Sequence, residues 1–164
     1  MAPVLVLTIG LGIAVATDMR TRRIPNWLTA GMASAGFGIA AAGGQVTPLH
    51  AALGLAGGLL LMLPGHLIGA TGAGDVKLMA AVGAVVGSDL ILRVFLYSAI
   101  AGGVLAVAVA LRRGCLEQTL FDTTRLATAP ADARRAIQTS DRTKRFAYGP
   151  AIAAGTLLSM MVHV

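Results

Sequence analysis

Two aspartates lie at the edges of strongly apolar segments of this sequence. Asp75 lies within the run Gly-Ala-Gly-Asp-Val-Lys at residues 72–77, and Asp18 ends the first apolar run. An ionisable side chain at membrane depth is costly and usually faces a protein interior or a water-filled cavity, so it indicates a functional site. Two carboxylates that share a site can activate a water molecule, one acting as a base and the other as an acid. The chemistry that this pair predicts is general acid–base catalysis, which requires no metal or organic cofactor.

The residues around Asp75 allow structural as well as catalytic interpretations. Gly72 and Gly74 permit irregular backbone and the close approach of another chain. Asp is also a preferred N-cap residue, so Asp75 could cap the helix that follows, with or without a catalytic role. Lys77 is interpreted first as a side chain that reaches the lipid headgroups, and second as a charge that biases a neighbouring carboxylate. The run lacks the third glycine of a dinucleotide fingerprint and the glycine-lysine pair of a phosphate loop, which argues against nucleotide binding.

The composition is that of a polytopic membrane protein. Hydrophobic residues make up 56% and charged residues 12% of the 164 residues, whereas soluble domains carry roughly a quarter charged residues. This length accommodates about six spans of roughly 20 residues and one modest loop. We therefore predict an all-α fold, a single-domain bundle of about six transmembrane helices over residues 1–164.

Charge, cysteine and histidine usage exclude several classes of function. The net charge of +6 comes from basic residues in a few loops between spans, which points to anionic lipid as a partner and away from nucleic acid. The single cysteine, Cys115, excludes a disulfide framework and a four-cysteine zinc site. His50, His66 and His163 have no ligand spacing, so no metal site is expected.

Six apolar segments alternate with turn residues and charged loops. We expect helices at about residues 2–17, 25–42, 50–63 or somewhat beyond, 76–86, 90–111 and 149–162. Pro25 and Pro150 suit the first turns of the second and last helices, and Pro64-Gly65 should disturb the end of the third. Glycine pairs four residues apart favour close helix packing; they are Gly54/Gly58, Gly65/Gly69 and Gly83/Gly87.

The positions of the basic residues predict the topology. Arg20, Arg22 and Arg23 follow the first segment, and the loop at about 112–145 holds eight of the thirteen basic residues, so both are assigned to the cytoplasm. Both termini are then outside, and the first segment is expected to be retained because no basic residue precedes it. Two crossings separate Asp18 from Asp75. An even number of crossings places both carboxylates at the cytoplasmic face.

Three motifs resemble those of the type IV prepilin peptidases, membrane aspartic proteases of the A24 type. Asp18 followed by Ile24-Pro25-Asn26 resembles the first catalytic motif, residues 72–80 the second, and Tyr148-Gly149-Pro150 the Phe-Gly-Pro that opens the last helix. The resemblance implies that Asp18 and Asp75 are catalytic. It implies supporting roles for the other motif residues, which are Pro25, Asn26, Gly72, Gly74, Lys77, Gly149 and Pro150.

The same resemblance implies the substrate and the location. Prepilins and pseudopilins would be cleaved after their basic leader, before the hydrophobic segment, at the cytoplasmic side of the inner membrane. The chain has neither the length nor the cysteines of the methyltransferase domain found in larger members. It is therefore similar to the short, peptidase-only members of tight-adherence (Flp) pilus systems. Residues 145–147 depart from the usual residues before Tyr148.

Two other functions fit an acidic residue in a membrane bundle. Gly-x-Gly-Asp proteases of the presenilin and signal-peptide-peptidase type cut within transmembrane helices, but they usually have Tyr before the first aspartate, where this chain has Thr17. A small ion-coupled transporter could use Asp75 as its carrier site. Against a transporter, the sequence shows no inverted repeat, and both acids are expected at one face.

Overall fold

The structure, a computed structural model, describes residues 1–67, 71–113 and 148–162. These residues form six α-helices and no β-strand, which confirms the predicted all-α fold. The helices are α1 (Ala2–Thr21), α2 (Asn26–Ala41), α3 (Pro48–Leu67), α4 (Ala73–Val86), α5 (Ser88–Arg113) and α8 (Gly149–Met161). Most of the predicted loop at 112–145 lies outside the described residues.

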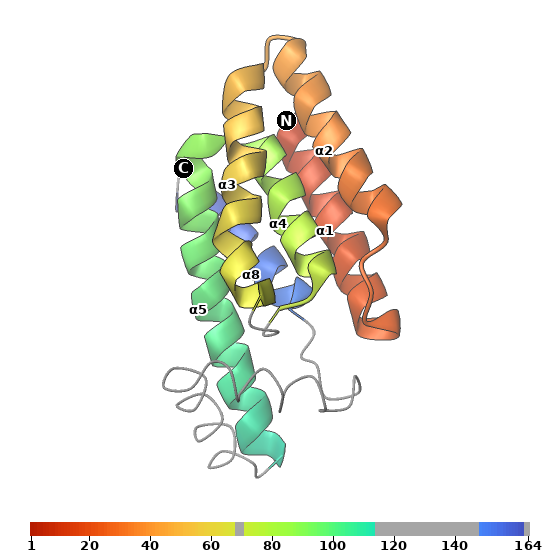
Figure 1. The fold of residues 1–164 in the computed structure, drawn as a ribbon, viewed down its shortest axis with the longest axis vertical. Helices are drawn as coiled ribbons and strands as arrows, with labels where there is room; N and C mark the ends of the chain where they lie inside the picture. Colours follow the sequence, from red (N-terminus) through yellow and green to blue (C-terminus); the bar gives the residue numbers. More distant parts are fainter. Residues whose placement is uncertain (68–70, 114–147, 163–164) are drawn as a thin grey trace.

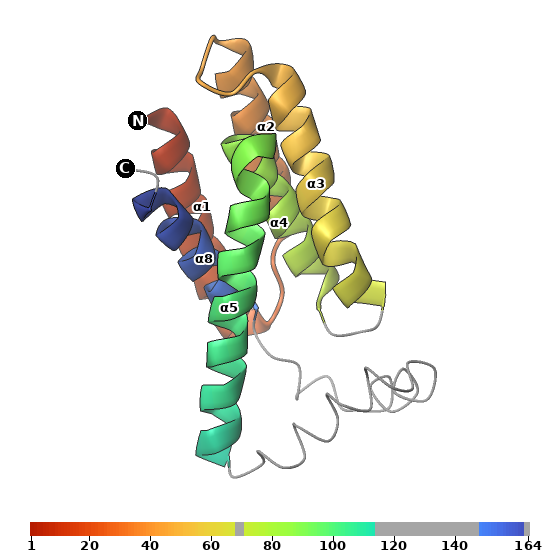
Figure 2. The same ribbon diagram turned by 90° about the vertical axis from the view of Figure 1, so that its left-hand side faces the viewer.

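Three of the described helices, α1, α3 and α5, are long and apolar enough to cross a membrane. Helix α4 is different, because it occupies the centre of the bundle (Figure 1 and Figure 2). Every residue from Leu78 to Val86 is buried, as expected of a helix that is apolar on all sides. Its 14 residues extend over about 21 Å, less than a hydrocarbon core of about 30 Å. Neighbouring helices therefore surround most of α4 in place of lipid.

Close contact between α3 and α4 depends on glycines of the pairs Gly54/Gly58 and Gly83/Gly87, which the sequence predicted to favour close packing. Gly54 of α3 and Gly83 of α4 touch through their backbones, because a Cβ on either would overlap the carbonyl oxygen of the other. Gly58 is similarly close to the backbone of Met79. Small residues let helix backbones approach and gain packing energy where no hydrophobic driving force acts between helices. This contact holds α4, and hence Asp75, in place.

Replacement of Gly54 by Ala is expected to lower the free energy of unfolding by about 1–3 kcal/mol, because the added methyl group forces α3 away from α4. The measurement is thermal or denaturant unfolding of the purified protein in detergent. Gly38→Ala is the matched control, since a Cβ at Gly38 meets no atom within 4 Å. Equal stability of the two variants would contradict the importance of this contact.

Several helix boundaries differ from the predicted ones. Helix α1 continues to Thr21, one turn past the expected end. Helix α3 ends at Leu67, somewhat beyond residue 63 as expected, but Pro64 lies inside the helix and does not end it. Proline removes only one N–H, and the helical hydrogen bonds around it can persist. Pro25 precedes α2 as its N-cap, with φ −64° and ψ 137°. The fixed φ of proline suits this position as well as the first turn.

The connection between α4 and α5 is shorter than expected. Gly87 alone ends α4, with a φ of 80° that favours glycine. Helix α5 therefore begins at Ser88, two residues before the predicted start at residue 90. The tight turn sends α5 back along the bundle toward the end at which α4 begins (Figure 2).

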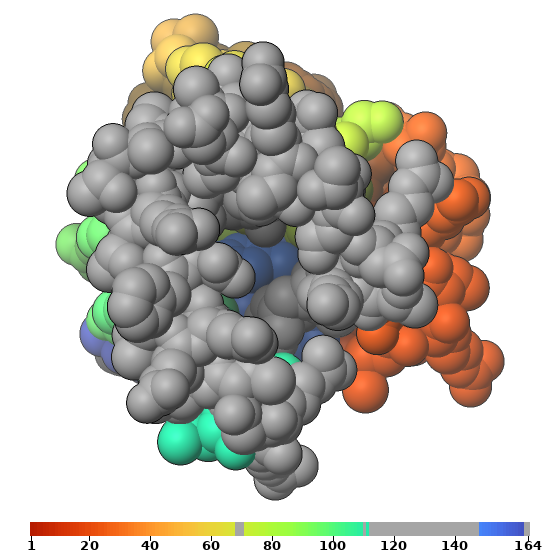
Figure 3. Space-filling model, turned by 60° about the horizontal axis from the view of Figure 1, so that its bottom comes forward, coloured from red at the N-terminus to blue at the C-terminus, as the bar shows by residue number. Residues whose placement is uncertain are grey.

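Three chain segments that carry the sequence motifs meet at one end of the bundle. The α1–α2 connection, the start of α4 and the start of α8 all lie toward the lower end in Figures 1 and 2. Figure 3 turns this end toward the viewer. Part of α8, in blue, is visible at the centre of the face, with the α1–α2 region in orange at one side. The fold therefore assembles the candidate site from helices distant in sequence.

Candidate active site

Asp18 lies in the last turn of α1 and is only 5% exposed. The helix ends because Arg22 adopts a left-handed conformation, with φ 52° and ψ 35°, and donates its main-chain N–H to the Asp18 carbonyl oxygen at 2.9 Å. Arg22 is the only non-glycine residue with positive φ among the described residues. A left-handed residue at a helix end redirects the chain. Here it turns the chain toward the start of α2.

The start of α8 fixes the Asp18 carboxylate. The N–H of Gly149 donates a buried hydrogen bond to Oδ2 of Asp18 at 2.9 Å. The first N–H groups of a helix have no partner within the helix, and they favour negative charge. A Cβ on Gly149 would lie 2.7 Å from this oxygen, so glycine is required for the approach. Pro150, which has no N–H, follows in the first turn of α8.

The interpretation of Asp75 as an N-cap is wrong. Gly72 is the N-cap of α4, and Asp75 is the third helical residue. Oδ2 of Asp75 accepts the N–H of Gly72 at 3.0 Å, which is the side-chain half of a capping box. The carboxylate thus helps to begin the helix from a different position, and it is 7% exposed.

Gly72 and Gly74 allow neighbouring groups to approach closely, because neither carries a side chain. The irregular backbone expected at these glycines is not found at Gly72. Gly72 has φ −77° and ψ 152°, values open to any residue. A Cβ on Gly72 would lie 3.1 Å from Oδ2 of Asp75, and one on Gly74 would lie 3.2 Å from Cβ of Ile24. Gly74 therefore lets the α1–α2 connection pack against the start of α4, and this contact brings the segment after Asp18 close to Asp75.

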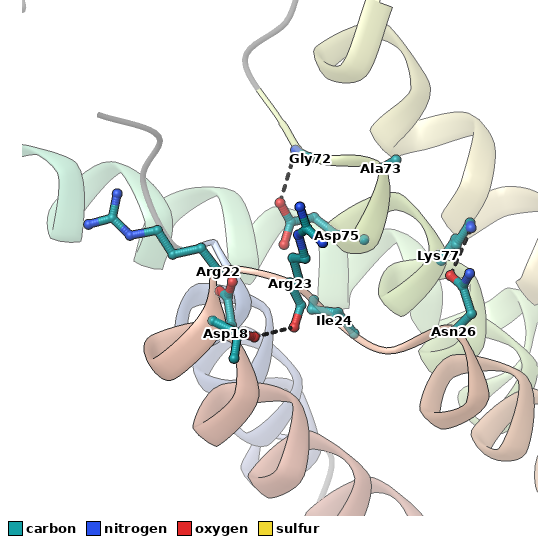
Figure 4. Close-up of a pocket in the computed structure, with 11 residues that line it drawn as sticks. Asp18, Arg22, Arg23, Ile24, Asn26, Gly72, Ala73, Asp75 and Lys77 are labelled. Carbon is teal, nitrogen blue, oxygen red and sulfur yellow. Dashed lines mark hydrogen bonds between the residues drawn. The ribbon is translucent and has the colours of Figure 1, made fainter. Parts of the chain in front are cut away.

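Asp18 and Asp75 line one pocket of about 560 Å³. Arg22 and Arg23 also line this pocket; in Figure 4 the Arg23 side chain is drawn beside Asp75, and the Arg22 side chain extends away from Asp75. The parity of membrane crossings predicted that the two acids share a face, and the structure brings them into one cavity. The remaining lining residues are Thr21, Ile24, Asn26, Gly72, Ala73, Gly74 and Lys77.

The surroundings of Asp75 favour its protonated form. Asp75 lies outside the three segments that are long enough to span a membrane. Burial raises the pKa of its carboxyl from 3.8 to about 6; the Gly72 hydrogen bond lowers the pKa, and the negative charge of Asp18 raises it. Two carboxyls that influence each other in this way titrate as a pair. The pair can therefore keep one proton at a pH at which an exposed carboxyl group would already have lost its proton.

We expect Asp75→Asn to remove a pH dependence of stability. The pKa of about 6 in the folded protein lies above the unfolded value of 3.8, so the free energy of unfolding falls as pH rises through this window. Asn cannot ionise, and its amide oxygen can still accept the Gly72 N–H. The free energy of unfolding of Asp75→Asn, relative to that of the wild-type protein, should therefore rise by about 2 kcal/mol between about pH 4 and 7.5. Thermal unfolding in detergent at the two pH values measures this difference. If the two proteins differ in free energy of unfolding by the same amount at both pH values, Asp75 is not a buried ionisable group.

Lys77 joins two of the motifs. Its Nζ donates a hydrogen bond to Oδ1 of Asn26 at 2.9 Å, at the rim of the pocket (Figure 4). Asn26 is the first residue of α2, directly after the N-cap Pro25. The bridge therefore ties the start of α2 to the start of α4. Neither of the two interpretations of Lys77 included this contact.

The sequence analysis assigned no role in the site to three residues that the structure places at or beside it: Arg22, Arg23 and Tyr148. Arg22 and Arg23 were assigned only to membrane topology, yet both line the pocket. The ring of Tyr148 packs against Gly102 of α5, where a Cβ would meet it at 2.6 Å. The hydroxyl of Tyr148 donates to the main-chain oxygen of Ser98 at 3.4 Å. The Gly-Gly pair at 102–103 in an apolar segment was the available signal for such a close approach.

Comparison with known protein families identifies a related family. Residues 5–107 match the model of the type IV leader peptidase family. The matched range includes Asp18 and Asp75 and ends before Gly149. No curated protein and no solved structure matches the chain.

Proposed function

We propose an aspartic-type prepilin peptidase function for this chain, which belongs to the type IV leader peptidase family. Family membership and the apolar helices identify a membrane-embedded peptidase with a general role in prepilin processing. The proposal adds the catalytic pair, the substrate class and the side of the membrane. Asp18 and Asp75 are the pair, and Flp-type prepilins and pseudopilins are the substrates.

One observation carries the proposal: two nearly buried aspartates from different helices line the same pocket. Each carboxylate accepts a main-chain N–H on its Oδ2, Asp18 from Gly149 and Asp75 from Gly72. The backbone therefore sets the orientation of both groups before substrate binds. Such preorganisation favours proton transfer at a fixed position.

In the mechanism we propose, one carboxyl is ionised and the other protonated. The ionised group takes a proton from water as the water oxygen attacks the scissile carbonyl carbon, and the protonated group donates its proton to the carbonyl oxygen. The tetrahedral intermediate then collapses. The C–N bond breaks, the leaving nitrogen takes a proton from the first carboxyl, and the hydroxyl proton returns to the second. The products are a leader with a new carboxylic acid and a new amine, which exchange a proton to become a carboxylate and an ammonium, and the pair regains its single proton.

The active site is proposed to face the cytoplasm at the inner membrane. Arg22 and Arg23 beside the pocket support this side, because positively charged residues are enriched in cytoplasmic loops. The same residues would also attract anionic lipid headgroups. A leader synthesised in the cytoplasm would reach the pocket from this face.

The test is to incubate the purified protein, in detergent or liposomes, with a candidate Flp-type prepilin and to locate the cut by mass spectrometry. We expect one cut between the basic leader and the apolar segment. A cut inside the apolar segment would favour an intramembrane protease instead. An absence of cleavage combined with ion-coupled uptake by proteoliposomes would favour a transporter.

A further inference from the structure

A second hollow adjoins the active-site pocket and opens on the side of the bundle. This α2–α3 groove has a volume of about 290 Å³. Its floor is Ala80 and Ala81 of α4, and it shares Asn26 and Lys77 with the pocket that holds the two aspartates. The other lining residues are Thr29, Ala30, Ala33, Leu55 and Leu59.

The groove exists because α2 and α3 diverge. They are joined by the short connection between residues 41 and 48 at one end of the bundle, and they separate toward the opposite end, where α4 is seen between them (Figure 1). Asn26, Thr29, Ala30 and Ala33 recur at helical spacing along one face of α2. Small side chains on α2 and α4 leave room for a further helix to approach closely. The groove therefore runs from the pocket along the apolar part of the bundle.

We propose that the α2–α3 groove docks the apolar helix of the substrate, so that the residues before this helix enter the pocket of Asp18 and Asp75. The inference rests on the proposed prepilin peptidase function. It adds a side of entry, which is between α2 and α3. The occupant is an apolar α-helix that begins next to the cleaved bond.

Continuity with the pocket selects this groove over a larger one. A hollow of about 340 Å³ between α1 and α2 is lined by residues such as Ile9, Trp27 and Gly31, and it shares no lining residue with the pocket of the two aspartates. The α2–α3 groove shares two. A substrate must present its helix and its scissile bond together, so the groove that joins the pocket is the one that fits.

The shared residues are suited to the point at which a substrate helix ends. Asn26 and Lys77 form a hydrogen-bonded bridge between the groove and the pocket. Backbone groups that leave a helix at a membrane need new hydrogen-bond partners. An ammonium group has three donors and an amide has both donors and an acceptor, so the bridge can bind a substrate backbone that becomes extended on entering the pocket.

Photo-cross-linking tests the docking site directly. A photoreactive residue is placed at Ala30, which lines the α2–α3 groove, or at Gly31, which lines the α1–α2 hollow. Both carry Asp18→Asn, so that bound prepilin stays intact. We expect cross-links to the apolar segment of the prepilin from position 30 and not from position 31. Cross-links from position 31 alone, or from position 30 to lipid alone, would overturn the inference.

A matched pair of variants tests the consequence for activity. Ala30→Phe should lower kcat/KM for prepilin about 10- to 100-fold, mainly through KM, because it fills space that an apolar side chain of the substrate would occupy. Gly31→Phe is the control of equal size, since a Cβ at Gly31 meets no atom within 4 Å. Equal activity of the two variants would overturn the docking proposal, whereas failure of the wild-type protein to cleave prepilin would overturn the proposed function itself. If Ala30→Phe lowers the unfolding temperature, the cross-linking result decides.

Discussion

Asn in place of either Asp18 or Asp75 is expected to lower kcat/KM for prepilin cleavage by at least about 10⁴-fold, to the limit of detection. Water activation and carbonyl protonation use one carboxyl each, and an amide can perform neither proton transfer. The change preserves shape, and the amide oxygen can still accept the N–H of Gly149 or Gly72 that the carboxylate accepts in the wild-type protein. The loss would therefore reflect chemistry and not folding. The measurement is cleavage of a purified prepilin by the purified, membrane-inserted variants.

The double variant provides an internal check. Groups that act in one step are strongly non-additive, so Asp18→Asn with Asp75→Asn should be no less active than either single variant. Asp89→Asn is the control, because the Asp89 side chain is 78% exposed and lies beside His50, away from the pocket. A properly inserted double variant that still processed prepilin would exclude the two-aspartate mechanism.

Gly149→Ala is expected to lower kcat about 100-fold with a small change in KM. The new Cβ would lie 2.7 Å from Oδ2 of Asp18, which is shorter than a van der Waals contact and therefore a steric clash. Either the carboxylate turns away or α8 moves, and both changes lose the hydrogen bond from the Gly149 N–H. A small displacement of a catalytic group can cost about 10²-fold in rate. Single-turnover cleavage of prepilin measures the effect on the chemical step.

The matched control for this prediction lies on α5. Gly103→Ala makes the same change of residue at a position where a Cβ meets no atom within 4 Å, so its activity should equal that of the wild-type protein. If Gly149→Ala is equally active, the α8 hydrogen bond does not position Asp18 for catalysis. If it loses activity through KM alone, the residue acts on binding and not on the carboxylate.

The sequence predicted much of the architecture because its signals are local. Apolar runs, glycines and prolines identified six helices, and the ends of α2 and α8 fall close to the predicted ones. Helix boundaries were less accurate at the end of α1 and at the start of α4, since hydropathy records the polarity of side chains and not the hydrogen bonds of the main chain. A helix can continue past the last apolar residue, as α1 does through Asp18 to Thr21.

The arrangement around each aspartate needed the tertiary structure. The sequence supported an N-cap role for Asp75, but the helix begins at Ala73, so the carboxylate accepts the Gly72 N–H from the third helical position. Likewise, Gly149 was known only as part of a motif. Its hydrogen bond to Asp18 joins residues 131 positions apart, and no local pattern reports such a contact.

By itself, the sequence determined that this protein is a helical membrane bundle and predicted that Asp18 and Asp75 lie at the same side, because hydropathy and the number of crossings depend only on chain order. Tertiary structure alone decided which main-chain N–H groups hold the two carboxylates, and that a groove between α2 and α3 meets their pocket at Asn26 and Lys77. These features depend on the rotation and depth of each helix against its neighbours. Those quantities are set by close packing, such as that of Gly54 on Gly83, which joins residues far apart in the chain.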